Sequence, residues 1–308
     1  MYALRREGRD DMNSAEWPEL PWNAWSKTAD TLHMWTQIVG KTRLALTPLQ
    51  NHWWNVPLYV TARGLGTSAI ACGDDALDIE FDFVEHELRM RLSSGKNESL
   101  TLRSKSVADF YREYQHCLAA LGVSVKIWPM PVEVQKPIRF DLDTQHSTYD
   151  RDYANRFWRV LVRAEKVFRA WAPSFMGKVS PVHFFWGSFD LAVTRFSGRT
   201  APSREGADSI QREAYSHEVI SAGFWPGNGG YGAAAFYCYA APVPEGLADK
   251  QILPEAAKWD KTLGEYVFLY DDVRLQPSPE EALLEFIENA YSAAADAAKW
   301  DRMLLDRN

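Results

Sequence analysis

The chain has 308 residues, a formal net charge of −7 and a hydrophobic content of 46%. This length and composition support a large apolar core in one or two domains and exclude a disordered protein. The acidic balance argues against a protein that holds nucleic acid or an anionic membrane through a basic surface. We therefore expect neither nucleic acid nor a membrane as a partner, and the sequence leaves the oligomeric state open.

The cysteines and the first residues indicate a cytoplasmic protein. There are three cysteines, none of them at metal-clip spacing, which suits reduced thiols. The opening residues mix both charges and lack the apolar stretch of a secretory signal. No window reaches the ~18 apolar residues that a membrane span needs.

Residues 1–21 are expected to form a flexible arm, because they mix both charges without an apolar period. The end of this arm, from Trp17 to Trp22, contains two prolines and is expected to lie extended against the body. A first helix is expected from near Thr28 to Pro48, since its apolar residues recur at three- and four-residue spacing.

The rest of the first half, residues 22–128, is expected to consist mainly of antiparallel strands. Residues 77–83 alternate apolar and acidic without a break, which is typical of a strand with one buried face. Ser106 followed by Asp109 resembles a helix cap, and Gly122 would stop that helix. Further strands are expected at residues 58–63, 88–92, 99–102 and 123–128.

Residues 129–152 contain three prolines and many polar residues, so we interpret them as a connector. The second half, residues 153–308, opens with a helical apolar face that stops before Pro173. Strands are expected at the run after His183 and at residues 215–224, 233–240 and 266–270. Ser278 and Pro279 then open the final helix.

The two halves share one pattern, in which a His, two aromatics, a β-rich run, an Arg and a Gly follow in the same order. His52 and Arg63 hold these places in the first half, and His183 and Arg195 hold them in the second. We predict an α+β fold of two fused helix–antiparallel-strands–helix repeats with pseudo-two-fold symmetry, in which helices cover one sheet system. The alternative is a chance likeness of two strand-rich compositions.

Three long runs carry a resemblance to a known family. They are residues 50–64, residues 180–196, and residues 213–219 with the following Gly223-Phe224-Trp225-Pro226-Gly227. Together they resemble a bacterial family known only as domain of unknown function 5996, over roughly residues 22–296. The resemblance implies a soluble bacterial protein and carries over no activity, cofactor or catalytic residue.

Three histidines are the first candidates for chemistry. If the repeats face each other, His52 and His183 can approach near the axis, with His217 on a neighbouring strand. With Glu218 they would make a ligand set for iron, zinc or manganese, or without a metal an acid–base site. Because His217 and Glu218 are adjacent on a strand, only one of them is expected to reach a common site. The alternative is that each histidine is hydrogen-bonded in the core.

Arg63 and Arg195 are the second candidates, because an arginine at a strand end can clamp a carboxylate or phosphate with two parallel bonds. The alternative is an ion pair, for example with the acids of residues 78–82. Aromatic residues near the histidines and in the glycine-rich loop 223–232 are expected to wall a pocket. They are Trp53, Trp54, Phe185, Trp186, Phe224 and Trp225.

These observations favour an enzyme that acts on a small organic molecule, which the arginines suggest is anionic. In it the histidines would supply acid–base groups or hold a divalent metal. Two alternatives use the same features. One is a protein that binds a small molecule without chemistry, and the other is a structural or assembly protein whose aromatics fill the core and an interface.

Overall fold

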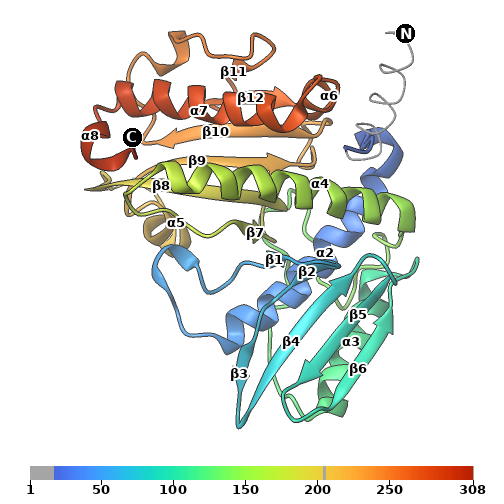
Figure 1. Ribbon diagram of the computed structural model, residues 1–308. Helices are drawn as coiled ribbons and strands as arrows, with labels where there is room; N and C mark the ends of the chain where they lie inside the picture. Colours follow the sequence, from blue (N-terminus) through green and yellow to red (C-terminus); the bar gives the residue numbers. More distant parts are fainter. Residues whose placement is uncertain (1–16, 204–205, 308) are drawn as a thin grey trace.

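The computed structural model describes residues 17–203 and 206–307, so most of the predicted flexible arm lies outside the described residues. Alternating apolar patterns form two antiparallel sheets (Figure 1). The N-terminal sheet has the order β1 (Tyr59–Val60), β2 (Gly64–Gly66), β4 (Asp75–Asp82), β5 (Glu87–Leu92) and β6 (Asn97–Thr101), with β3 (Ile70–Cys72) also paired to β4. The C-terminal sheet has the order β11 (Lys258–Asp260), β12 (Glu265–Leu269), β10 (Ala235–Ala241), β9 (His217–Trp225), β8 (Asp190–Thr200) and β7 (His183–Phe185).

The two sheets meet at a single antiparallel bridge. Leu58, which precedes β1, and Phe184 in β7 exchange two backbone hydrogen bonds of 2.9 Å. The expectation of one sheet system is therefore corrected to two sheets that share one bridge. The mixed α+β class is confirmed, whereas the pseudo-two-fold relation of the halves stays a prediction.

A turn interrupts the strand that was expected at residues 58–63. The Thr61 hydroxyl accepts hydrogen bonds from the backbone N–H groups of Arg63 and Gly64, at 3.2 and 2.9 Å. Such a side-chain bond offers the backbone an alternative to the ladder. The chain therefore reverses between β1 and β2, and Arg63 lies in this turn.

Long helices pack against both sheets (Figure 1). α4 (Arg151–Trp171) and α7 (Pro279–Ala297) lie side by side on the C-terminal sheet, and α3 (Val107–Leu121) packs on β5 and β6. The predicted caps of α3 are present, because the Ser106 hydroxyl accepts from Asp109 N–H and Gly122 adopts φ 82°. The described part also has the short helices α5 (Ser209–Ala214), α6 (Tyr270–Arg274) and α8 (Arg302–Leu305), with 3-10 turns η1 (Asn51–Trp53), η2 (Ala172–Ser174) and η3 (Leu247–Asp249).

The helix α2 (Trp22–Leu46) is buried on all sides over most of its length. Every residue of 28–43 except Asp30 is buried. Its polar side chains reach other segments, since His33 Nε2 lies 2.8 Å from Gly187 O and Gln37 bonds both backbone groups of Val132. α2 thus fixes the segment after α3 and the turn after β7 to one central element.

The strand that was expected at residues 123–128 is absent, since within the described chain this segment pairs with no other strand. Pro129 and Pro131 follow it, and proline cannot donate to a ladder. No helix of the described ranges is long and apolar enough to cross a bilayer.

The extended segment before α2 docks on the body, as its prolines led us to expect. Trp17 is 1% exposed, and its ring centroid lies 6.3 Å from that of Phe236. The Tyr270 hydroxyl donates to Pro18 O at 2.7 Å. This contact ties the beginning of the described chain to the C-terminal sheet.

We expect Trp17→Ala to lower the free energy of unfolding by about 3–5 kcal/mol, because it removes a fully buried ring from the core. Urea denaturation would measure the loss. Trp128→Ala is the control, since Trp128 is 70% exposed, and its effect should stay within about 0.5 kcal/mol. Equal losses in the two variants would contradict the docking of Trp17.

Candidate functional site

The pleat of the C-terminal sheet gives it two different faces. On β8, Leu191, Val193 and Arg195 point to the helices, as the contacts of Arg195 with α4 and α7 show. The alternate residues of β8 and their cross-strand partners point the other way. We call this second surface the site face; it carries His183, Asp190, Ala192, Thr194, Phe196, His217, Val219, Ser221, Gly223, Tyr237 and Tyr239.

Small residues form the floor of the site face, and tyrosines lie across it. A Cβ on Gly223 would come within 2.2 Å of the Tyr237 ring, so the absence of a side chain there lets Tyr237 cross β9. The Tyr237 and Ser188 hydroxyls both donate to the Asp190 carboxylate. Burial raises the pKa of Asp190. Both of the hydroxyl groups that donate to its carboxyl group are neutral.

A roof formed by η1 and α5 covers one end of the site face (Figure 1). His52 binds α5 through its backbone N–H to Glu213 and through its ring Nδ1 to Ala214 O, both at 3.3 Å. His52 and Trp53 adopt φ values of 59° and 61°. Left-handed backbone costs a non-glycine residue of order 1 kcal/mol or more, and it clusters at functional sites. This turn directs Trp54 onto the sheet.

The three predicted histidines come together around Trp54. The ring centroids of His52 and His217 are 5.6 Å apart, and those of Trp54 and His183 are 5.8 Å apart. Phe196 lies below, 4.7 Å from His52 and 5.9 Å from Trp54. The first and second halves of the chain therefore both contribute to this cluster.

Lys178 joins this cluster, although no pattern in the sequence predicts a role for it. Its Nζ lies 2.8 Å from His52 Nε2, 4.9 Å from the Trp54 ring centroid and 4.8 Å from the Phe196 centroid. No carboxylate of the described residues lies within ion-pair distance of it. A solvent-accessible cation is thus held between two rings without an acidic partner. We call His52, Trp54, Lys178, Phe196 and His217 the outer site.

The contacts of His52 define its tautomer. An ammonium can only donate and a carbonyl can only accept, so Nε2 accepts from Lys178 and Nδ1–H donates to Ala214 O. Burial, and then the charge of Lys178, lower the pKa of His52. His52 is therefore a neutral imidazole at neutral pH.

His183 is buried more deeply, with 1% of its surface exposed, and neither ring nitrogen has a hydrogen-bond partner among the residues that the structure describes. The rings of Trp54, Tyr59 and Phe185 surround it at centroid distances of 5.4–5.8 Å. Burial, and then the charge of Arg43, lower the pKa of His183 to about 3. His183 is thus a core residue among aromatic rings, as the alternative supposed, and within the described residues only the hydrogen bond of that alternative is missing.

The predicted metal ligands do not fit a metal ion. Glu218 points away from the histidines and accepts bonds from Ser197 and Arg199, at 2.9 and 2.8 Å. The lone pair of His52 Nε2 is taken by Lys178, whose charge would repel a cation. In residues 17–203 and 206–307, no three His, Cys, Asp or Glu side chains are grouped to hold an ion. The expectation that His217 and Glu218 face opposite ways agrees with this arrangement.

The two predicted arginine clamps have structural roles instead. Arg63 pairs with the buried carboxylate of Asp82 at 2.6 Å and with Glu85 at 3.4 Å, which is the ion pair that we considered as its alternative. Arg195 is 1% exposed on the helix face, where its guanidinium carbon lies 3.6 Å from the Trp171 ring centroid. Neither side chain reaches the site face, because one lies in a turn and the other points into the core.

The predicted aromatic wall is divided among separate places. Trp54 and Phe185 lie at the histidines, and the half-buried Trp53 flanks them. Trp186 donates to Val56 O at 2.8 Å and packs against Gly40 of α2. Phe224 is completely buried on the helix face against Phe236, and Trp225 packs on Tyr231 within the glycine-rich loop. Phe224 is a core residue because the strand alternation points it to the helices.

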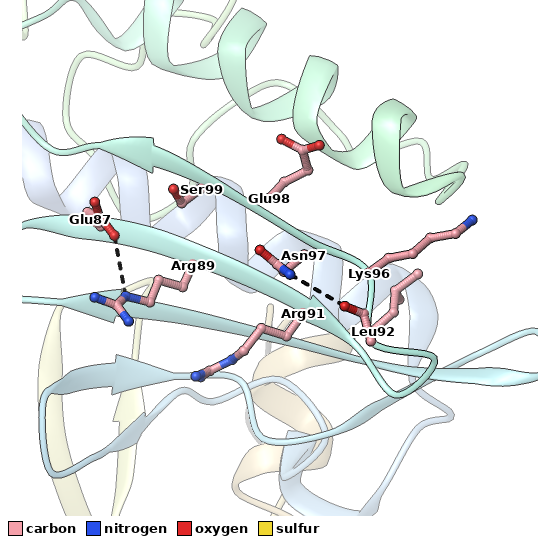
Figure 2. A pocket seen from close by; sticks show the side chains of 9 residues that line it. Glu87, Arg89, Arg91, Leu92, Lys96, Asn97, Glu98 and Ser99 are labelled. Atoms are coloured by element: carbon pink, nitrogen blue, oxygen red, sulfur yellow. Dashed lines mark hydrogen bonds and ion pairs between the residues drawn. The ribbon is translucent and has the colours of Figure 1, made fainter.

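A surface hollow on β5 and β6 lies far from this cluster in the sequence and carries paired charges (Figure 2). Arg91 binds Asp78 and Glu80, both at 2.7 Å, and Arg89 lies 3.4 Å from Glu87. Because each arginine already has an acidic partner, this hollow is a salt-bridged sheet surface.

We expect Lys178→Met to raise the pKa of His52, because the variant removes a neighbouring positive charge. The pKa should remain below the ordinary value, since burial is the larger cause. NMR titration of the imidazole measures this shift, with the exposed Lys126→Met as the control. An unchanged pKa would show that the ammonium does not contact the ring.

Because the pKa of His183 is lowered in the folded state, we expect the free energy of unfolding to decrease in acid. The unfolded imidazole takes a proton near its ordinary pKa of about 6.5 and the folded one only near 3, so the unfolded state binds more protons in between. Stability should fall with decreasing pH in this window, by up to about 1.4 kcal/mol per unit. Denaturation of wild type and His183→Phe from pH 7 to 4 isolates this contribution. Parallel pH profiles would refute it.

Among the comparisons with known proteins, the match comes from a family model of sequence. A family model described as "Family of unknown function (DUF5996)" matches residues 17–307. No curated protein and no solved structure matches the chain.

Proposed function

The chain therefore belongs to the DUF5996 family of unknown function, and from its geometry we propose that it is an enzyme acting on a small organic anion. The anion would bind at the outer site, against Lys178 and Trp54. The imidazoles of His52 and His217 would be the acid–base groups. Because the residues do not fit a metal, we propose chemistry that the side chains perform themselves.

The observation that carries this proposal is the uncompensated charge of Lys178. An exposed lysine usually forms a loose ion pair or remains solvated, whereas this ammonium is fixed against His52 and two rings. A carboxylate that approached it would gain a charge-assisted hydrogen bond. The Trp54 ring offers an apolar surface for the rest of the same molecule.

His217 is the group best placed to exchange a proton with such a ligand. It is half-buried, its Nδ1 lies 3.1 Å from the Ser216 hydroxyl, and its Nε2 has no partner in the described part of the chain. Imidazole is the commonest acid–base group in enzymes. If the ligand displaced Lys178 from His52, Nε2 of His52 would become a second base.

Two further points support the proposal. The two His-aromatic runs, which we propose to derive from one duplicated unit, both place a histidine against Trp54. Cys72, Cys117 and Cys238 are free thiols, which supports a cytoplasmic protein.

Binding without catalysis is the second candidate. Both ring nitrogens of His52 already have partners, so the ligand must displace Lys178 before this histidine can act as a base. A protein that only holds the anion needs no such displacement.

Benzoate tests the binding step, with the neutral isostere benzamide beside it. We expect benzoate to raise the midpoint of thermal unfolding, since a ligand that binds only the folded state stabilises it, and benzamide to leave it unchanged. Lys178→Met should abolish the shift and Lys126→Met should retain it. Equal responses in the two variants would rule out the outer site.

Proton exchange tests the catalytic step without a known substrate. Small keto acids incubated with the protein in D2O should lose their α-proton NMR signal, because a positioned base removes that proton. His217→Gln should retain benzoate binding and lose the exchange. Binding that persists with no exchange in wild type would select the non-catalytic candidate.

A further inference from the structure

A second group of donors lies on the inner side of Trp54, around Arg43 of α2. Arg43 is 8% exposed, and its Nε–H donates to Asn55 O at 2.9 Å. Its Nη1 is buried and has no hydrogen-bond partner in residues 17–203 and 206–307. The guanidinium carbon lies 5.3 Å from the Tyr59 ring centroid, and in the described ranges no carboxylate lies within ion-pair distance of the guanidinium.

His183 is the second member of this group. It contacts the same Tyr59 ring at a centroid distance of 5.7 Å, and both of its nitrogens lack partners in the described part of the chain. The charge of Arg43 acts on its titration, so the two side chains are electrostatic neighbours. Two polar side chains, each more than nine-tenths buried, therefore border one aromatic ring, and each has at least one nitrogen without a hydrogen-bond partner in the described residues.

An isolated protein rarely leaves such groups unmatched. A buried donor without a partner costs about 1–3 kcal/mol, and a buried charge without a partner costs more. Water would satisfy the hydrogen bonds but would leave the guanidinium charge uncompensated. An oxyanion supplies both the acceptors and the missing charge, and guanidinium matches the geometry of a carboxylate.

We propose that Arg43 and His183 form an inner site for a small oxyanion of carboxylate type. The guanidinium Nη1–H donates to one oxygen of the anion, and an N–H of the His183 imidazole donates to the same anion. Trp54 separates this inner site from the outer site, because its ring contacts both His183 and Lys178. The inner site uses neither Lys178 nor His217, so an experiment can contradict this proposal without contradicting the proposed function.

Formate, the smallest carboxylate, is the probe, and neutral formamide is its control. The experiment uses the full-length Lys178→Met variant, so that the outer site does not contribute. We expect formate to raise both the unfolding midpoint and the pKa of His183, because a bound anion stabilises the imidazolium. Formamide should change neither quantity. If formate also leaves both quantities unchanged, the inner site does not exist.

Arg43→Met in the same background removes the guanidinium and keeps an unbranched side chain. Formate affinity should fall roughly ten- to hundredfold, as expected for one charge-assisted bond. Arg91→Met is the control, since Arg91 is an exposed arginine of β5, and its affinity should not change. Equal affinities in the two variants would overturn the assignment.

Two further measurements keep the proposal testable if Arg43→Met does not fold. His183→Phe replaces the imidazole with an apolar ring. The rise of the unfolding midpoint that formate causes should then shrink by an amount similar to that expected for Arg43→Met. An undiminished rise overturns the proposal. A crystal structure grown with formate should place it on Arg43. Water alone at that position overturns the proposal as well.

Discussion

The complete burial of α2 is the constraint on which the rest of the structure depends. A helix that faces protein on every side must find a partner inside the molecule for each polar side chain. His33 and Gln37 bind the turn after β7 and the segment after α3, and Thr42 accepts a 2.7 Å bond from Tyr114 of α3. Arg43 satisfies only part of its guanidinium in this way, and the remaining donor capacity lies beside the histidines.

The strand alternation then places helix-packing residues and site-face residues on opposite sides of a single strand. Arg195 and Phe196 are neighbours in β8, yet they serve opposite sides of the sheet. Arg195 is held by the rings of Trp171 and Tyr291, at 3.6 and 4.3 Å, and its positive charge is used to pack two helices against the sheet. Phe196 lies beneath His52 and Lys178.

Much of the fold follows from local patterns. The unbroken alternation of residues 77–83 and the capped α3 are predictable because short-range propensity and burial agree there. His52 and His183 were selected because each precedes two aromatics, and His217 because of its neighbouring strand; the three lie together. Lys178 and Arg43 could not be selected from the sequence, because the contacts that distinguish them are made with other segments. Lys178 contacts His52, and Arg43 contacts Tyr59. The ion pair of Arg63 likewise depends on another segment, because the pairing of β2 with β4 sets Gly64 opposite Asp82.

The bridge between Leu58 and Phe184 has a consequence for assembly. Edge strands expose unpaired N–H and C=O groups that recruit other chains, and proteins protect such edges by covering or shortening them. Here β1 and β7 are two and three residues long, and each lies against the other. Each half of the molecule thus shields the aggregation-prone edge of the other. If cleavage within residues 129–152 let the two halves separate, the edges of β1 and β7 would both be exposed to pairing with other chains.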